Sequence, residues 1–398
     1  MAEMDAYNEA LQSGQYQKPT GLLGKYDNVR RFWEDEQVGL YLRPFIKDTA
    51  HSKCQQGNSL RVLDIGCGGG DGLEVIRIAT EQPEETYFYK GIDLNEGLLK
   101  QAESIFINKP NLHFINSNYN DFDYTADEPY DLYLANYGTL SHNPDDKTAE
   151  LLAKIAKHGR NGAIICVDWL GRYAYEWQTL WTNDYDNNQW MDYVISYIYS
   201  EDQAEQPSEL TAFPLRIMGR SEVKGIYDRA NELCEGSLVL RELADRSSFV
   251  GRHQDTAQYN SYCKPLRCVV NRLFEPGITT NLDELIIDYH IMDGFDDINE
   301  YHSKLVNSWN HLALRTKALV DNEPVPPMPE DAPTVLMSTV AAMDRIIKAT
   351  SNITIGNPRA CLIEPQLGYC LRELEMELQC GQGCGHGLVA IFEVAKQN

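Results

Sequence analysis

A glycine-rich run, VLDIGCGGGDG at residues 62–72, is the clearest chemical motif in the sequence. It joins an apolar strand pattern to a helical pattern, and its glycines let a ligand approach the backbone closely. Dinucleotide-binding turns need glycines at the first, third and sixth positions, but here the sixth position counted from Gly66 is Asp71. No Gly-Lys-Ser/Thr follows, which excludes a P-loop as well. The turn is therefore expected to hold another kind of ligand.

Two carboxylates flank this turn and indicate the charge of its ligand. Asp64 ends the first strand, where it would repel a pyrophosphate but suit an ammonium or a sulfonium. Asp93 follows the glycines by a little over ~20 residues, where an acid can accept both hydroxyls of a ribose. It could instead cap the next helix, a role for which Asn95 competes. S-adenosylmethionine has the matching chemistry, because it carries a ribose, an ammonium and a sulfonium but no phosphate.

The elements that must position these residues alternate along the chain. Apolar runs at 60–65, 86–92, 112–116, 130–134 and 162–169 are separated by helical patterns such as GLEVIRIAT and LNEGLLKQAESIF. This alternation predicts an α/β fold, a mostly parallel sheet with helices on both faces.

Four pieces of this region occur in an order and spacing that resembles one family. DIGCGGG at 64–70, IDLN at 92–95, YDLYLAN at 130–136 and GAIICVDW at 162–169 resemble the motifs of class I, Rossmann-like S-adenosylmethionine-dependent methyltransferases. The resemblance covers a little over a quarter of the chain. It implies a seven-stranded sheet whose last, antiparallel strand is GLVAIFEVAK, near the end of the sequence.

The expected organisation follows from the resemblance and the patterns around it. Residues 1–60 are expected to form an N-terminal helical cover, and residues 61–254 the methyltransferase core. A Tyr/Trp-rich excursion at 170–220 interrupts that core. Residues 255–350 are expected to form a helical insertion or lid, and residues 351–398 to return to the sheet as its last strand.

The resemblance also implies which residues bind the cofactor. Asn118 stands where the family has an acid for adenine, with Asp121 as a rival, and an arginine of the N-terminal GKYDNVRR run could pair with the cofactor carboxylate. The expected cofactor-binding residues are Asp64, Gly66, Cys67, Gly68, Asp71, Asp93, Leu94, Asn118, Tyr119, Asn136, Tyr26 and Arg30.

Candidate catalytic and acceptor-binding groups follow the fourth, fifth and sixth strands, since ligands sit at the carboxyl ends of strands in open α/β sheets. His142 is a candidate general base, Asn136 would face the methyl donor, and Asp168 could orient the acceptor. Their alternatives are a loop histidine bonded to backbone and an N-cap or ion-paired aspartate. Tyr137, Trp169 and His253 are expected to contact the acceptor. Arg252 and His253 belong to a polar run, SSFVGRHQDTAQYN, that could reach the pocket mouth or form an ordinary surface loop.

The amino-acid composition indicates which binding partners and which cell compartment to expect for the protein. A net charge of -24 argues against nucleic acid. The ten scattered cysteines and the polar N-terminus predict a reduced cytoplasmic protein with no membrane segment, monomeric or homodimeric. QCGQGCGHG brings Cys380, Cys384 and His386 together, but its spacing matches no zinc pattern, so a Gly-rich turn and no metal are expected.

The predicted function is methyl transfer from S-adenosylmethionine to a small molecule in an enclosed pocket, with oxygen acceptors favoured over nitrogen or carbon. The alternatives are a methyltransferase that acts on a protein or peptide, and a non-catalytic S-adenosylmethionine-binding module. A nicotinamide oxidoreductase is disfavoured because Asp71 replaces the required glycine.

Overall fold

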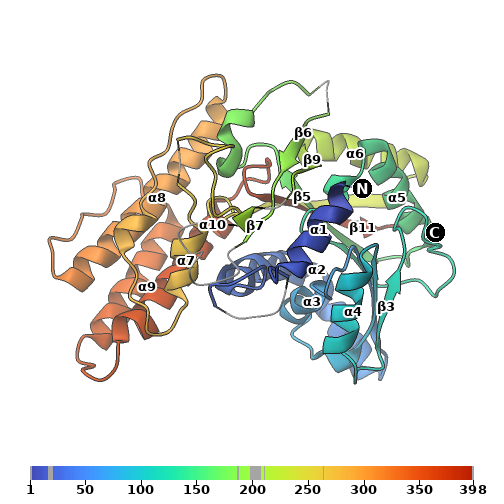
Figure 1. The fold of residues 1–398 in the computed structure, drawn as a ribbon, viewed down its shortest axis with the longest axis horizontal. Coiled ribbons are helices and arrows are strands. Elements are labelled where there is room, and N and C mark those ends of the chain that lie inside the picture. Colours follow the sequence, from blue (N-terminus) through green and yellow to red (C-terminus); the bar gives the residue numbers. More distant parts are fainter. Residues whose placement is uncertain are drawn as a thin grey trace.

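The computed structural model describes residues 2–16, 21–185, 188–197, 208–209, 211–262 and 264–396. Its centre is a sheet in which seven strands follow the order β3-β2-β1-β4-β5-β11-β10 (Figure 1). The strands are β1 (Leu60–Ile65), β2 (Tyr87–Asp93), β3 (Leu112–Asn116), β4 (Leu132–Ala135), β5 (Ile164–Gly171), β10 (Leu238–Arg246) and β11 (Gly387–Val394).

The first five of these strands are parallel, and β11 runs antiparallel between β5 and β10. The α/β class and the antiparallel last strand are thus as predicted. The sheet also gains two strands from the excursion, β9 (Phe213–Met218) beside the end of β5 and β6 (Trp190–Tyr193) beside β9. A separate two-stranded ribbon pairs β7 (Ser196–Tyr197) with β8 (Ser208–Glu209). The rest of the predicted excursion, residues 186–187, 198–207 and 210, lies outside the described residues.

Helices cover both faces of the sheet because the strands bury side chains in both directions. One face packs α2 (Asp35–Gln55) and α3 (Gly72–Thr80) against alternate strand residues such as Val62 and Leu132. The opposite face packs α5 (Asp145–His158) and α6 (Arg220–Leu233) against the intervening residues. Such continuous burial on both faces is typical of parallel strands. At the far end of the sheet, α4 (Glu96–Ile105) packs beside β2 and β3.

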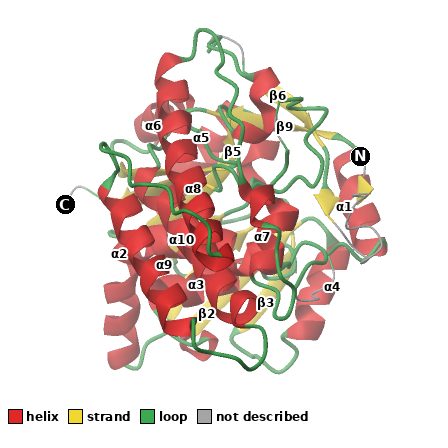
Figure 2. Cartoon of the chain, turned by 90° about the vertical axis from the view of Figure 1, so that its left-hand side faces the viewer, coloured by secondary structure: helices red, strands yellow, loops and turns green. Residues whose placement is uncertain are grey.

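A helical layer stands beside the sheet and is inserted between β10 and β11 (orange to red in Figure 1; Figure 2 shows its helices in front of the sheet). Its apolar core, which includes Trp309, Leu305 and Leu371, continues into residues of the N-terminal segment and of the excursion. The layer extends to residue 378, so the expected boundary at residue 350 falls between two of its helices. Its elements are α7 (Arg267–Leu273), η6 (Leu282–Leu285), α8 (Asp296–Asp321), α9 (Thr334–Thr350), η7 (Arg359–Ile363) and α10 (Glu364–Leu378).

The N-terminal part forms α1 (Ala2–Gln12) and a π-helical turn, η1 (Arg30–Glu34), that continues into α2. Helix α1 contacts α4 and β9 and so lies across the carboxyl edge of the sheet between them. Three short 3-10 segments complete the described elements: η2 (Glu84–Thr86), η3 (Thr139–His142) and η4 (Tyr175–Leu180). Within the described ranges, no helix combines the length and the apolar character needed to cross a bilayer.

Candidate active site

One cavity lies at the carboxyl ends of β1, β2 and β4, with Met4 and Tyr7 of α1 in its wall. Open α/β sheets bind their ligands at this edge. The predicted site residues that line the cavity are Asp64, Gly66, Cys67, Gly68, Asp71, Asp93, Leu94, Tyr119, Asn136, Tyr137 and His142. The predicted site residues outside its lining are Tyr26, Arg30, Asn118, Asp168, Trp169 and His253.

The Gly-rich turn bends sharply between β1 and α3. Gly66 and Gly68 have φ of 68° and 53°, a left-handed conformation that favours glycine. A Cβ on Gly66 would lie 2.5 Å from a methyl of Thr139, so a larger residue does not fit. The N–H groups of Gly66 and Cys67 both donate to the carbonyl of Ile92, at 2.8 and 3.1 Å. These bonds hold the turn against the end of β2.

Asp93 connects the turn to the element that follows β2. Its Oδ2 accepts from the N–H of Gly68 and its Oδ1 from the N–H of Asn95, both at 2.8 Å. Asn95 itself accepts from the N–H of Leu98 at 3.1 Å and caps α4. The capping role considered for Asp93 therefore belongs to Asn95. Burial raises the pKa of the Asp93 carboxyl, which faces the cavity.

Asp64 lies at the end of β1 with only 3% of its surface exposed. Burial raises the pKa of Asp64 to about 7, although a hydrogen bond from the hydroxyl of Tyr89, at 2.6 Å, opposes the rise. A cationic group in the cavity would stabilise the ionised carboxylate, because an opposite charge nearby favours the charged form.

The segment before η1 brings a cation to the turn. Lys25 Nζ and the hydroxyl of Tyr26 both donate to the carboxylate of Asp71. A Cβ on Gly68 would lie 3.8 Å from Lys25 Nζ, which places the ammonium over the turn. Sequence reasoning missed Lys25 and favoured Arg30 from the same GKYDNVRR run, since nothing in the run distinguishes which basic residue points inward.

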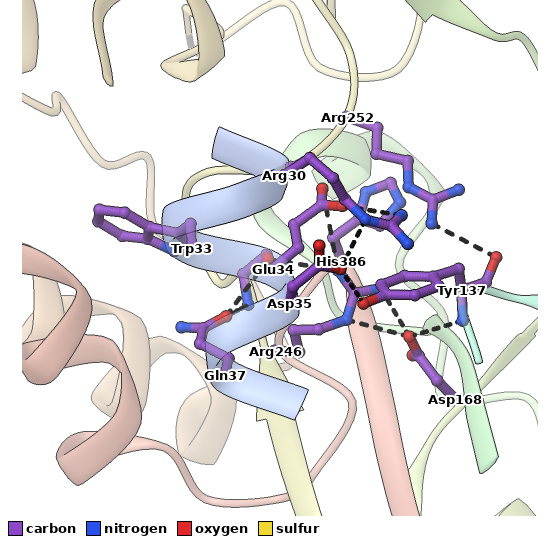
Figure 3. A network of polar contacts seen from close by, with 12 residues as sticks. Arg30, Trp33, Glu34, Asp35, Gln37, Tyr137, Asp168, Arg246, Arg252 and His386 are labelled. Atoms are coloured by element: carbon purple, nitrogen blue, oxygen red, sulfur yellow. Dashed lines mark hydrogen bonds and ion pairs between the residues drawn. The ribbon is translucent and has the colours of Figure 1, made fainter. Parts of the chain in front are cut away.

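Arg30 lies behind the cavity wall, stacked on Tyr137. Its guanidinium carbon is 3.3 Å from the centroid of the Tyr137 ring, and its Nε is 2.7 Å from Asp35 Oδ1 (Figure 3). The Tyr137 hydroxyl donates to the same Asp35 carboxylate. Tyr137 has φ of 61°, which is uncommon for a residue with a side chain. These contacts hold the end of β4 in an unusual conformation beside the cavity.

Asp168 is hydrogen-bonded to the backbone of Tyr137. Its Oδ2 accepts from the N–H of Tyr137 at 3.1 Å and lies 2.8 Å from Nη2 of Arg246. Both partners of this ion pair are fully buried. Asp168 thus lies one layer behind the cavity lining. Its neighbour Trp169 is buried among residues of the sheet, α5 and α6, and His253 pairs with Glu176 at 3.1 Å.

His142 ends η3 and faces the cavity. Its Nε2 is 3.2 Å from the hydroxyl of Tyr7, and its ring stacks on Phe213 with 5.8 Å between centroids. Burial lowers the pKa of His142 to about 4. The imidazole is therefore neutral near pH 7, but it is a weak proton acceptor at that pKa.

The turn after β3 holds the two residues expected at the adenine, and it places one in the cavity lining and the other outside it. Tyr119 lines the cavity, and its hydroxyl donates to Asn143 Oδ1 at 3.2 Å. Asn118 uses its Oδ1 to accept from the N–H of Asn120 at 2.9 Å, a local turn, and lies outside the cavity lining. Its rival, Asp121, is exposed and also outside that lining.

Arg252 gives the cavity a second cation, at the end of β4. Its Nη2 donates to the carbonyl of Tyr137 at 3.4 Å, and its buried Nε has no hydrogen-bond partner in the described structure. No ion pair joins Arg252 to a described carboxylate, whereas nearby Arg267 contacts both Asp27 and Glu34. Arg252 is the member of the SSFVGRHQDTAQYN run that reaches the cavity.

One family model built from known proteins matches part of this chain. The model is described as a methyltransferase domain, and it matches residues 62–162, which run from β1 to the loop before β5. This stretch of the chain is similar to a methyltransferase domain, and it contains the motifs at 64–70, 92–95 and 130–136. No curated protein sequence matches the chain.

Three solved structures illustrate the more distant similarity. An S-adenosylmethionine-dependent methyltransferase from Clostridium acetobutylicum is 14% identical, with coverage of 60% of this chain and 90% of that one and a TM-score of 0.36. The CcbJ methyltransferase from Streptomyces caelestis is 16% identical, with coverage of 56% of this chain and 86% of that one and a TM-score of 0.35. CalS10, an amino pentose methyltransferase from Micromonospora echinaspora, is 13% identical, with coverage of 62% of this chain and 93% of that one and a TM-score of 0.34. Similarities this weak carry no argument about the acceptor.

Proposed function

We propose that this protein transfers the methyl group of S-adenosylmethionine to an oxygen of a small, anionic acceptor held in the cavity. The observation that carries the proposal is the arrangement of Asp64 and Asp93 around one Gly-rich turn in a cavity that α1 covers. When bound, the cofactor would supply a methyl group on a sulfonium, and the acceptor oxygen would take that methyl group and leave S-adenosylhomocysteine as the thioether product.

The cavity residues fit the functional groups of this cofactor. Asp93 would accept the ribose hydroxyls, and Asp64 lies where a buried carboxylate gains from an ammonium group. Lys25 would bind the cofactor carboxylate by exchanging part of its contact with Asp71. Tyr119 and Leu94 would border the adenine.

The acceptor side of the cavity favours a group that is already anionic. His142 has a lowered pKa and would remove a hydroxyl proton poorly, whereas a carboxylate acceptor needs no base. Arg252, which forms no ion pair with a described carboxylate, would bind and orient such an acceptor. Asn136 and Tyr137 would border the transferred methyl group, and Asp168 would act through its bond to the N–H of Tyr137.

The test combines cofactor calorimetry with a screen of metabolite extracts supplied with isotopically labelled methyl donor. We expect micromolar or tighter binding of S-adenosylmethionine, no binding of NAD, and a labelled small-molecule ester that mild base hydrolyses. Binding of NAD instead of S-adenosylmethionine would overturn the proposal. Label that enters a protein fraction would support a protein methyltransferase, and a base-stable product would exclude a carboxylate acceptor.

A further inference from the structure

Glu176, His253 and His386 form a buried cluster outside the methyl-transfer cavity. These residues are 4%, 1% and 0% exposed. Glu176 Oε1 is 3.1 Å from Nδ1 of His253, and its Oε2 bonds Nδ1 of His386. One donor atom from each residue lies within 4.8 Å of the other two.

The carboxylate of this cluster differs from several other buried carboxylates, which pair with an arginine. Asp27 and Glu34 each contact the guanidinium of Arg267, and Asp168 contacts that of Arg246. Glu176 has no arginine or lysine in an ion pair within the described residues. Its partners are two imidazoles and the N–H of His253, at 2.9 Å. A buried carboxylate is costly without a compensating cation, so this cluster is suited to receive one.

Aromatic rings pack against both imidazoles. Trp177 lies 5.3 Å from His386 between ring centroids, and Tyr193 lies 4.9 Å from His253. The Nε2 atoms of both histidines are buried without a hydrogen-bond partner in the described structure. The histidines are therefore held by packing and by their hydrogen bonds to Glu176.

We propose that Glu176, His253 and His386 bind a divalent first-row transition-metal ion. Two imidazoles and one carboxylate suit Zn²⁺, and also Co²⁺, Fe²⁺ or Mn²⁺. Each neutral imidazole would bind through Nδ1 and keep its proton on Nε2, so neither histidine loses a proton. A tetrahedral ion would take a water molecule as its remaining ligand.

Such an ion would join three segments that are far apart in the sequence. Glu176 belongs to η4 of the excursion after β5, His253 follows β10, and His386 immediately precedes β11. The ion would therefore fasten the two ends of the helical insertion to the excursion. It would also fix the backbone next to Arg252, which lines the cavity.

A second group of possible ligands provides the control. Asp245, Cys380 and Cys384 also lie within 4.8 Å of one another. The Asp245 carboxylate, however, already accepts from the N–H groups of Gly383 and Cys384 at 2.7 and 2.8 Å. It thereby holds the Gly-rich loop that the sequence places there, and we do not assign a metal to it. In this loop, the thiol of Cys380 and the N–H of Cys384 contact the Asp245 carboxylate, and the imidazole of His386 contacts Glu176.

The test is a metal titration of the full chain, purified without a histidine tag. We expect one Zn²⁺ per chain by mass spectrometry of the metal, and visible absorption on titration with Co²⁺ after chelation. His253→Ala and His386→Ala should each weaken Co²⁺ binding at least tenfold and remove the rise in melting temperature caused by Zn²⁺. The Cys380→Ser/Cys384→Ser variant should retain the ion.

The proposal is wrong if the folded wild-type protein binds no Co²⁺ or Zn²⁺ at micromolar concentration, a result that needs no variant. It is also wrong if the double cysteine variant loses the ion as the histidine variants do. Because the readouts are metal content and absorption, they are independent of S-adenosylmethionine binding.

Discussion

The carboxylate of Asp93 accepts a hydrogen bond from the N–H of Gly68 at 2.8 Å, so the end of β2 is tied directly to the Gly-rich turn after β1. Strands β1 and β2 pair in parallel, so the turn after β1 and the end of β2 lie side by side. The contact places a half-buried carboxylate at one side of the cavity while the turn forms its floor.

Replacing Asp93 by Ala should weaken S-adenosylmethionine binding by about 1–3 kcal/mol, the loss expected for charged hydrogen bonds. Calorimetry with S-adenosylhomocysteine measures the effect. Asp121→Ala is the matched control, because Asp121 is an exposed acid outside the cavity lining. Unchanged affinity in Asp93→Ala would remove Asp93 from the cofactor site.

Cofactor affinity should rise with pH through the titration of Asp64. With its pKa at about 7, the free carboxyl is largely protonated at pH 6. A bound ammonium favours the ionised form, so binding releases a proton below pH 7 and the affinity increases up to roughly tenfold per pH unit, levelling off above pH 7. Calorimetry in two buffers of different ionisation enthalpy detects this proton. Asp64→Asn should abolish the release, and a wild-type protein that takes up a proton would contradict the assignment.

Arg252→Met should impair the acceptor more than the cofactor. Loss of a charge-assisted hydrogen bond of about 1.5–3 kcal/mol would lower kcat/KM for the acceptor roughly 10- to 150-fold. The dissociation constant of S-adenosylhomocysteine should stay within about twofold, since we assign its carboxylate to Lys25. Arg241→Met is the control, because Arg241 is a half-exposed arginine paired with Glu393 on the sheet edge. Equal loss of cofactor and acceptor binding would instead place Arg252 at the cofactor.

Trp169→Ala should destabilise the fold by about 3–5 kcal/mol, the usual cost of truncating a fully buried aromatic side chain. Trp169 was expected at the acceptor, but its side chain packs in the core beneath α5 and α6. Denaturant unfolding measures the loss, and Trp169→Phe should recover most of it. A Phe variant with normal stability but a strongly raised KM for the acceptor would restore Trp169 to the binding site.

The sequence by itself determined the parallel core and the floor of the cavity. Strand and helix periods, the glycines at 66 and 68, and the acids at 64 and 93 act over short stretches of chain. The residues that matter there are placed by the strand that carries them, so motif and spacing predict their position. The substitution of Asn for the family's acid at position 118 was visible too, and the structure shows that its side chain serves a local turn.

Only the tertiary structure decided which residues form the cavity's other wall and the buried Glu176 cluster. Tyr7, Lys25 and Arg252 reach the cavity from segments whose patterns are those of ordinary surface helices and loops. The contact between Glu176 and His386 spans 210 positions in the chain. Such contacts depend on how the N-terminal helix and the helical insertion pack against the sheet, and no local backbone preference encodes that packing.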